Sequence, residues 1–229
     1  MKKHAIIVAG GRGMRMGGSL RKQFLPVGGI PILMHTLNCF YDYSPEINLV
    51  LVLPGDDLGY WKRLCEKHHF SLPHFLVEGG PSRFHSVRNG LESIEGEEGL
   101  VAIHDGVRPF VTQEIISSGF GEAAILGSAI AVVPLQDSLR KLNPDGNSCF
   151  QEREYFRLVQ TPQTFQLSKI KQAYKVSELP QFTDDATVYE FQGWQVNLIK
   201  GHSTNIKITT PEDLEYADFL VKKKQIQSK

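Results

Sequence analysis

The sequence predicts an α/β fold, in which a mostly parallel β-sheet is covered by helices on both faces. Short runs of apolar residues alternate along the chain with segments whose apolar residues recur at helical spacing. The apolar runs are nearly continuous, which is typical of strands that are buried on both faces. The chain has 229 residues and 41% hydrophobic content, so it is long enough for one large domain with a sizeable core.

Five apolar runs are predicted to form strands, at residues 5–9, 49–53, 75–77, 100–104 and 129–133. The segments between them are predicted to be helices, at residues 31–43, 57–69, 82–94 and 113–126. Pro31 suits the first turn of a helix, and Ser82 suits a helix cap. This alternation is typical of a Rossmann-like sheet, in which ligands bind at the carboxyl ends of the strands.

The pattern changes after residue 134. Residues 138–142 and 150–153 flank the strong turn signal of residues 143–147, which predicts a β-hairpin arm within residues 136–160. Because an isolated hairpin is marginally stable in water, we expect the arm to pack against a second subunit in a homodimer; a surface loop is the alternative.

The rest of the chain is predicted to complete a single domain that spans residues 1–229. The chain returns from the arm through residues 161–165. Strands at residues 196–199 and 205–208, followed by a helix that begins at Pro211, are then predicted to close the fold.

Composition excludes several classes of protein. The formal net charge of +0 argues against broad nucleic-acid binding, which usually requires a basic domain. Cys39, Cys65 and Cys149 are odd in number and widely spaced, so we expect reduced thiols in a cytoplasmic protein. No apolar segment approaches the roughly 20 residues that span a bilayer, and the N-terminus does not match a signal peptide.

A glycine-rich loop, residues 9–23, follows the first predicted strand. Its glycines allow close backbone approach to a ligand, and Arg15 and Lys22 are among its basic residues, which together suit a phosphate group. The alternative is an ordinary glycine-rich turn with exposed cations. The dinucleotide fingerprint fails because Met16 stands at its third glycine, and the Walker loop fails because Ser19 stands at its lysine.

The loop resembles the GxGxRxxxxxxK signature of sugar-phosphate nucleotidyltransferases, whose fixed positions are occupied by Gly11, Gly13, Arg15 and Lys22. Further segments, in order along the chain, resemble the family of 2-C-methyl-D-erythritol 4-phosphate cytidylyltransferases. These segments are residues 78–87, 104–109, 161–163 with 183–186, and 205–214. The sequence departs from the family at Arg21, where proline is usual, and at Pro81, where many relatives carry an acidic residue.

The resemblance implies that a sugar-phosphate oxygen attacks the α-phosphorus of CTP and releases pyrophosphate, in the non-mevalonate route to isoprenoid precursors. A phosphomonoester is largely ionised near pH 7, since its second pKa is about 6, so no activating base is required. The main task is to hold two anions that repel each other and to stabilise the transition state. Mg²⁺ is the expected cofactor.

The resemblance also assigns roles to residues. Catalytic contacts to the triphosphate are expected from Arg15, Lys22 and Lys207. Nucleotide binding is expected from Ala9, Gly10, Gly11, Gly13, Gly80, Ser86 and Asp105, and Asp105 is also the expected Mg²⁺ ligand. The sugar phosphate is expected at Arg108, Ser138, Arg153 and Thr183, with the arm reaching the neighbouring subunit. The alternatives are a turn-forming aspartate at Asp105, an interior helix serine at Ser86 and exposed cations elsewhere.

Two other functions remain open from the sequence. A ribitol 5-phosphate cytidylyltransferase shares the fold and most of the motifs, although residues 161–163 and 183–186 favour the methylerythritol enzyme. A nucleotide-binding relative without catalysis is the other alternative. The presence of four residues argues against it: Arg15, Lys22, Asp105 and Lys207.

Overall fold

The computed structural model describes residues 1–10 and 21–227. Its strands are β1 (Lys3–Val8), β2 (Pro26–Val27), β3 (Ile30–Pro31), β4 (Asn48–Leu53), β5 (Phe75–Glu78), β6 (Leu100–Asp105), β7 (Ser128–Pro134), β8 (Leu139–Leu142), β9 (Ser148–Gln151), β10 (Arg157–Gln166) and β11 (Leu198–Lys200). Its α-helices are α1 (Ile32–Tyr43), α2 (Gly55–Lys67), α3 (Arg83–Glu92), α4 (Gln113–Leu126), α5 (Leu167–Ala173), α6 (Asp185–Glu190) and α7 (Pro211–Gln227). The described residues also form the 3-10 turns η2 (Lys22–Phe24) and η3 (Arg153–Tyr155).

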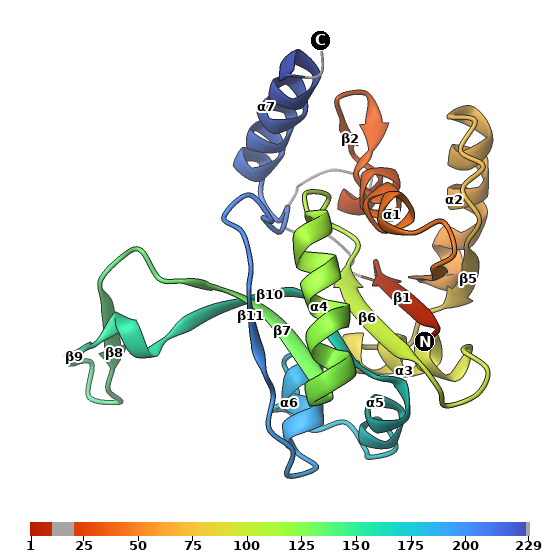
Figure 1. Ribbon diagram of the computed structural model, residues 1–229. Helices are drawn as coiled ribbons and strands as arrows, with labels where there is room; N and C mark the ends of the chain where they lie inside the picture. Colours follow the sequence, from red (N-terminus) through yellow and green to blue (C-terminus); the bar gives the residue numbers. More distant parts are fainter. Residues whose placement is uncertain (11–20, 228–229) are drawn as a thin grey trace.

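The main sheet has the strand order β11-β7-β10-β6-β1-β4-β5 (Figure 1). The pairs β6–β1, β1–β4, β4–β5 and β11–β7 are parallel. Strand β10 is antiparallel to both of its neighbours, β6 and β7. The predicted α/β fold with a mostly parallel sheet is therefore confirmed.

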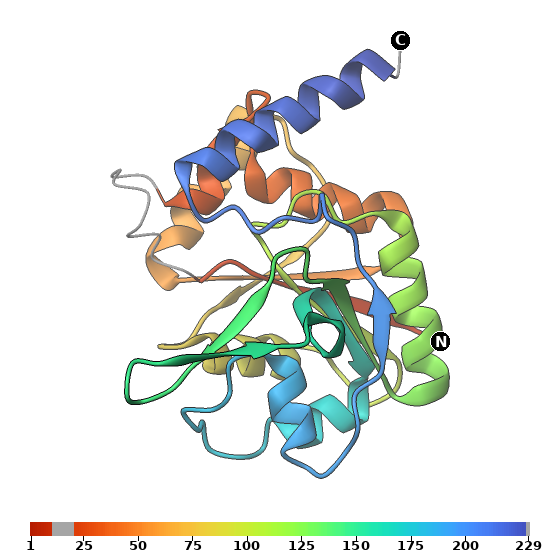
Figure 2. The ribbon, with the colours of Figure 1, turned by 90° about the vertical axis from the view of Figure 1, so that its left-hand side faces the viewer.

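Helices cover both faces of the sheet, and strand β1 shows why its residues 5–8 are all apolar. Ala5 and Ile7 are buried with side chains of α1, α2 and α4. Ile6 and Val8 are buried on the opposite face with side chains of α3, α5 and α6. Figure 2 shows the two groups of helices on opposite sides of the strands. Because successive side chains of a strand point to opposite faces, a strand buried on both faces has no polar alternation.

Strand β10 was predicted only as a return segment at residues 161–165. It places polar side chains inside the sheet region, where Thr161, Gln163 and Thr164 are buried. Thr161 forms hydrogen bonds with His104 and Asp105 at the end of β6, and Gln163 with Asp184 and Ala186 at the start of α6. These contacts require polar side chains, so the strand lacks a continuous apolar run. Helices α5 and α6 were also not predicted.

The predicted strand at residues 205–208 is wrong. This segment runs past the end of the sheet, and Ile208 N–H donates a hydrogen bond to Val107 O at 2.9 Å. Ile208 is buried in a separate cluster with Val27 and Ala217, beneath α7. The apolar side chain of Ile208 is therefore explained by burial beneath α7, and not by membership of a strand.

The predicted hairpin is present as strands β8 and β9, which form a two-stranded antiparallel sheet of their own. This arm projects away from the main sheet (Figures 1 and 2). Gly146 closes its turn with φ of 84°, a left-handed conformation that glycine adopts without strain. The arm exposes large apolar side chains: Leu142, Phe150 and Tyr155 are 76%, 65% and 80% exposed.

None of the helices in the described part of the chain is long and apolar enough to cross a membrane.

Candidate functional site

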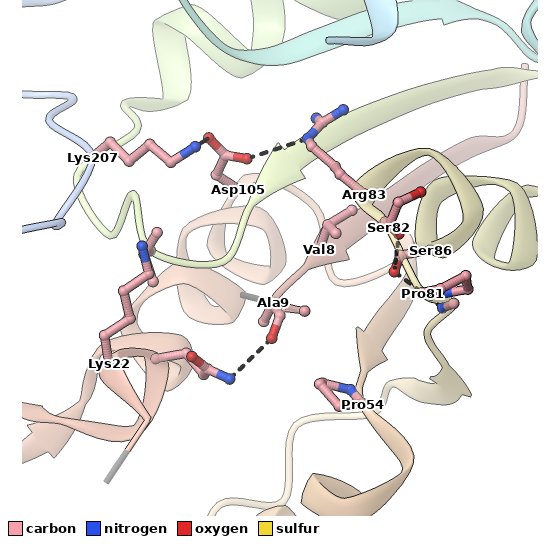
Figure 3. A pocket seen from close by; sticks show the side chains of 14 residues that line it. Val8, Ala9, Lys22, Pro54, Pro81, Ser82, Arg83, Ser86, Asp105 and Lys207 are labelled. Carbon is pink, nitrogen blue, oxygen red and sulfur yellow. Dashed lines mark hydrogen bonds and ion pairs between the residues drawn. The ribbon is translucent and has the colours of Figure 1, made fainter. Parts of the chain in front are cut away.

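A cavity of about 410 Å³ lies at the carboxyl ends of the parallel strands, within the usual size range of ligand sites. It brings together all of the predicted catalytic and nucleotide-binding residues that the structure describes: Ala9, Gly10, Lys22, Gly80, Ser86, Asp105 and Lys207. Ala9 and Gly10 follow β1, Gly80 follows β5, and Asp105 is the last residue of β6. Lys22 begins η2, Ser86 lies in α3, and Lys207 precedes α7. Figure 3 shows Arg83 and Lys207 directed at Asp105, with Lys22 and Ala9 across the cavity. The predicted residues Gly11, Gly13 and Arg15 lie outside the described residues.

One wall of the cavity is the turn that leads from β5 into α3. Ser82 caps α3, with its side chain accepting a hydrogen bond from His85 N–H. Ser86 Oγ accepts a hydrogen bond from Gly80 N–H at 3.1 Å and donates one to Ser82 O at 2.9 Å. A Cβ atom at Gly80 would lie 2.3 Å from His85 Cβ, so only glycine fits there. Ser86 thus fixes the turn and keeps only acceptor capacity toward a ligand.

Asp105, the last residue of β6, is surrounded by cations. Its Oδ2 lies 3.0 Å from Lys207 Nζ and 3.3 Å from Arg108 Nε. Its Oδ1 lies 3.8 Å from Arg83 Nε. Burial raises the pKa of Asp105, but the charges of Arg83, Lys207 and Arg108 outweigh burial and hold it well below its usual range. These four residues, which we call the Asp105 cluster, are therefore charged and carry a net positive charge that suits an anion.

Arg83 is held in place from its other side by Asp185, at the beginning of α6. Arg83 Nη1 and Nη2 donate to Asp185 Oδ1 and Oδ2 at 2.8 and 2.7 Å. Tyr174 OH donates to the same carboxylate at 2.6 Å. Arg83, Tyr174 and Asp185 were missing from the predicted site. The signal that could have found Arg83 and Asp185 is that both fall in segments on which the family resemblance rests.

His104 fixes the backbone of the same turn. Its Nε2 lies 3.0 Å from Arg108 O, which only accepts hydrogen bonds, so Nε2 carries the proton. Burial lowers the pKa of His104 to about 4, so the ring is neutral near pH 7. Nδ1 therefore accepts from the Thr161 hydroxyl at 3.0 Å, and Thr161 Oγ1 accepts from Asp105 N–H at 3.0 Å. This relay connects β10 to the end of β6.

Lys207 owes its position to the start of α7. Next to it, Ile208 is fully buried. Asp213 Oδ2 accepts hydrogen bonds from Thr209 N–H at 2.8 Å and Thr210 N–H at 2.9 Å. A buried apolar residue and a capped helix therefore hold the backbone on which Lys207 stands.

A second cavity, of about 310 Å³, adjoins the first and shares Arg83, Asp105 and Lys207 with it. The predicted substrate residues Arg108 and Thr183 line this second cavity. Arg108 is also held by a hydrogen bond from its Nη1 to Asn205 O at 2.8 Å. The Asp105 cluster therefore stands between two adjacent cavities.

The other two predicted substrate residues, Ser138 and Arg153, line neither of these cavities. They line a small hollow on the arm, and Arg153 donates a hydrogen bond to Gln136 O. Within the described chain, the structure brings Arg108 and Thr183 together with Asp105, and leaves Ser138 and Arg153 on the arm.

The described residues contain no group of three or more His, Cys, Asp or Glu side chains that could hold a metal ion. Asp105 is the only carboxylate among the described residues that line the first cavity. Mg²⁺ binds through one or two carboxylates together with phosphate oxygens. Asp105 therefore fits a metal ion only when a phosphate-bearing ligand supplies further oxygens.

Neutral His104 makes stability depend on pH. Its pKa falls from 6.5 in the unfolded chain to about 4 in the fold, so the unfolded chain binds more protons between these values. Its contribution is full above pH 6.5 and decreases by about 3 kcal/mol as pH falls to 4. We expect His104→Asn to reduce the dependence of the free energy of unfolding on pH, measured by urea denaturation between pH 4 and 7. His69→Asn, at an exposed position, is the control; equal slopes in all three proteins would contradict the role of His104.

Comparisons with known proteins agree on one family. A sequence model of 2-C-methyl-D-erythritol 4-phosphate cytidylyltransferase matches residues 3–223. Proteins of that name from Bacteroides thetaiotaomicron and Phocaeicola vulgatus are 50% and 47% identical over 221 residues, which cover 96% of this chain and 100% of each relative.

Solved structures give the same result. The 4-diphosphocytidyl-2C-methyl-D-erythritol synthase of Anaerococcus prevotii is similar with a TM-score of 0.84 and 30% identity, over 96% of both chains. The 2-C-methyl-D-erythritol 4-phosphate cytidylyltransferase of Thermus thermophilus is similar with a TM-score of 0.78 and 32% identity, over 97% of this chain and 100% of that one. The resemblance predicted from the motifs is confirmed, and the chain belongs to the 2-C-methyl-D-erythritol 4-phosphate cytidylyltransferase family.

Proposed function

We propose that the protein transfers a cytidylyl group from CTP to 2-C-methyl-D-erythritol 4-phosphate and releases pyrophosphate, as a step in the synthesis of isoprenoid precursors. The observation that carries this proposal is the Asp105 cluster between two adjacent cavities. A reaction between two anions needs cations at the point where they meet. The family to which the chain belongs supports this choice of substrates.

The first cavity suits the nucleotide. Gly10 and Gly80 line it, and a Cβ atom at Gly10 would lie 3.4 Å from Ser86 Oγ and narrow the space beside that hydroxyl. Because the Ser86 hydroxyl proton is used on Ser82 O, Ser86 accepts from a ligand donor. We propose that this donor is the amino group of cytosine or a ribose hydroxyl.

The phosphates lie, in this proposal, between Lys22 and Lys207, with Arg15 added on the basis of the family motif. A phosphate oxygen of the sugar phosphate forms a bond to the α-phosphorus, and the bond from that phosphorus to the bridging oxygen breaks. The pyrophosphate leaves with the electron pair. Lys22 and Lys207 stabilise the charge that gathers on the α-phosphate, and Arg108 with Thr183 holds the incoming phosphate.

Mg²⁺ is the proposed cofactor. When it is bound by Asp105 and the triphosphate, it supplies charge neutralisation on the phosphate oxygens. The protein's own cations hold the substrates in line, and no general base is needed, because the attacking phosphate is largely ionised.

The arm is proposed to complete the second cavity in a homodimer. Ser138 and Arg153 stand on the arm and line neither cavity, and exposed Leu142 and Phe150 offer an apolar contact surface. Arg153 of one subunit then binds the sugar phosphate of the other. We also propose a cytoplasmic location, which suits the free thiols of the three cysteines.

The substrate assignment is tested by pyrophosphate release from CTP and Mg²⁺ with each of two alcohol phosphates. We expect turnover with 2-C-methyl-D-erythritol 4-phosphate, little with ribitol 5-phosphate, and none after chelation of the metal. A clear preference for ribitol 5-phosphate would contradict the assignment and identify ribitol 5-phosphate as the substrate. Binding of CTP without release under several divalent metals would identify a nucleotide-binding relative without catalysis.

Lys207 is assigned to charge that develops in the transition state. We expect Lys207→Met to lower kcat about 100-fold or more, as loss of other preorganised charge stabilisers does, with a smaller effect on the dissociation constant of CTP. Steady-state kinetics and calorimetry measure the two effects. Lys200→Met, on the exposed side of β11, is the matched control. A rise in KM with an unchanged kcat would contradict the assignment.

The arm's role is tested by mixing subunits. Arg15→Ala removes the nucleotide half of a site, and Arg153→Ala removes the arm's half. If sites are shared, a mixed dimer retains one intact site of its two and recovers about half of the unaltered activity. Tagged heterodimers purified from co-expressed chains provide the measurement, and dimers with both substitutions on each chain are the control. No recovery would mean that each site is built from one chain.

A further inference from the structure

Arg21 stands where the family usually has proline, and it makes an ion pair that proline could not make. Its Nη1 lies 2.8 Å from Asp57 Oδ2. The backbone of Arg21 has φ of −67° and ψ of 139°, and the φ value is the one that a proline ring would impose. The chain therefore keeps the backbone shape of proline at this position and holds it with a side chain.

Asp57 is a rigid anchor for this ion pair. It lies in the first turn of α2, where the helix dipole favours a negative charge, and it is 6% exposed. Burial raises the pKa of Asp57, and the positive charge of Arg21 acts in the opposite direction. A buried carboxylate of this kind is stable only when it is paired and hydrogen-bonded, so Arg21 and Asp57 depend on each other.

Asp57 also connects the two ends of the glycine-rich loop. Gln23, which is 1% exposed, donates from Nε2 to Asp57 Oδ2 at 3.3 Å and to Ala9 O at 3.0 Å. The second of these hydrogen bonds is drawn beside Ala9 in Figure 3. Ala9 N–H donates to Val52 O at 3.0 Å, which ties this end to β4. The Asp57 carboxylate and the Gln23 amide therefore fix the positions of residues 9 and 21–23 relative to each other.

Lys22 lies between the two residues that Asp57 holds. Arg21 and Gln23 are its neighbours in the chain, and both contact the Asp57 carboxylate. The side chain of Lys22 lines the first cavity, as do Ala9 and Gln23. Movement of Arg21 away from Asp57 would therefore shift the backbone from which Lys22 reaches the cavity.

We propose that Asp57 is a positioning residue for the reaction, which acts through Arg21 and Gln23 to hold Lys22 and the backbone of Ala9 in place for the triphosphate. The ion pair holds the backbone of Arg21 at a φ angle that a proline ring would also impose. The inference rests on the proposed function, since it concerns the nucleotide half of that site.

The test compares Asp57→Asn in two backgrounds, the unaltered chain and Arg21→Pro. Asparagine still accepts the hydrogen bond from Gln23 but has no charge for Arg21. We expect Asp57→Asn to lower kcat/KM for CTP about tenfold in the unaltered background and less than about twofold in the Arg21→Pro background, because the ring then holds the backbone. A structural role of Asp57 alone would give the same loss in both backgrounds, and that result would overturn the proposal.

If Asp57→Asn does not fold, Arg21→Ala and Arg21→Pro are compared with Asp57 unaltered. Arg21→Ala is expected to lower kcat/KM for CTP by a similar factor and Arg21→Pro by less than about twofold, and equal losses in the two variants would overturn the proposal. Where Asp57→Asn folds, the pair Arg21→Ala with Asp57→Asn is expected to lose no more than either single change. Asp56→Asn, on the same turn of α2 and exposed, is the matched control, and circular dichroism melts report folding for every variant. Additive losses in the double variant would overturn the proposal. An unaltered protein without turnover would instead contradict the proposed function, whereas failure of the inference alone leaves the unaltered protein active.

Discussion

The ionised carboxylate of Asp105 at the end of β6 is the interaction on which the candidate site depends. An isolated carboxylate buried at this depth would be strongly destabilising. Arg83, Arg108 and Lys207 compensate it from three separate segments of the chain. Because Arg83 and Lys207 line both cavities and Arg108 lines the second, the contacts that stabilise the carboxylate also place positive charge where two anions would meet.

The surrounding structure restrains each member of the cluster. Asp185 and Tyr174 hold Arg83, and the relay from His104 to Thr161 holds the backbone of Asp105. The relay needs a strand beside β6 that carries polar side chains, and β10 meets this need because it lies antiparallel between β6 and β7. Strand β10 therefore has two effects: it interrupts the parallel order of the sheet, and its Thr161 side chain holds the backbone of Asp105.

The strands that could be predicted from the sequence are those whose own residues form a continuous apolar run. The strands near residues 5–9, 49–53 and 100–104 are buried on both faces, so a run of apolar residues is enough to find them. Strand β10 was missed because its buried residues include Thr161 and Gln163, which pair with distant groups. The segment at residues 205–208 was read as a strand because Ile208 is apolar, although it is buried beneath α7.

The same limit applies to the site. The motifs indicated Asp105, Lys22 and Lys207, and the fold brings them to one cavity. They did not show that Arg83 is shared between Asp105 and Asp185, because residues 83 and 185 are separated by 102 positions and meet only in the fold. Nor could the loss of proline at Arg21 be interpreted until Asp57 was found beside it.

The most direct test of the central claim is the single-turnover rate of Asp105→Asn with CTP and 2-C-methyl-D-erythritol 4-phosphate both saturating. Asparagine preserves the shape of the side chain but removes the charge that places Arg83, Arg108 and Lys207. If the cluster organises both cavities, the rate falls by about 100-fold or more while the protein stays folded. A tenfold change in rate corresponds to about 1.4 kcal/mol of activation free energy. A rate within about threefold of the unaltered protein would mean a much smaller change in activation free energy and would contradict the account.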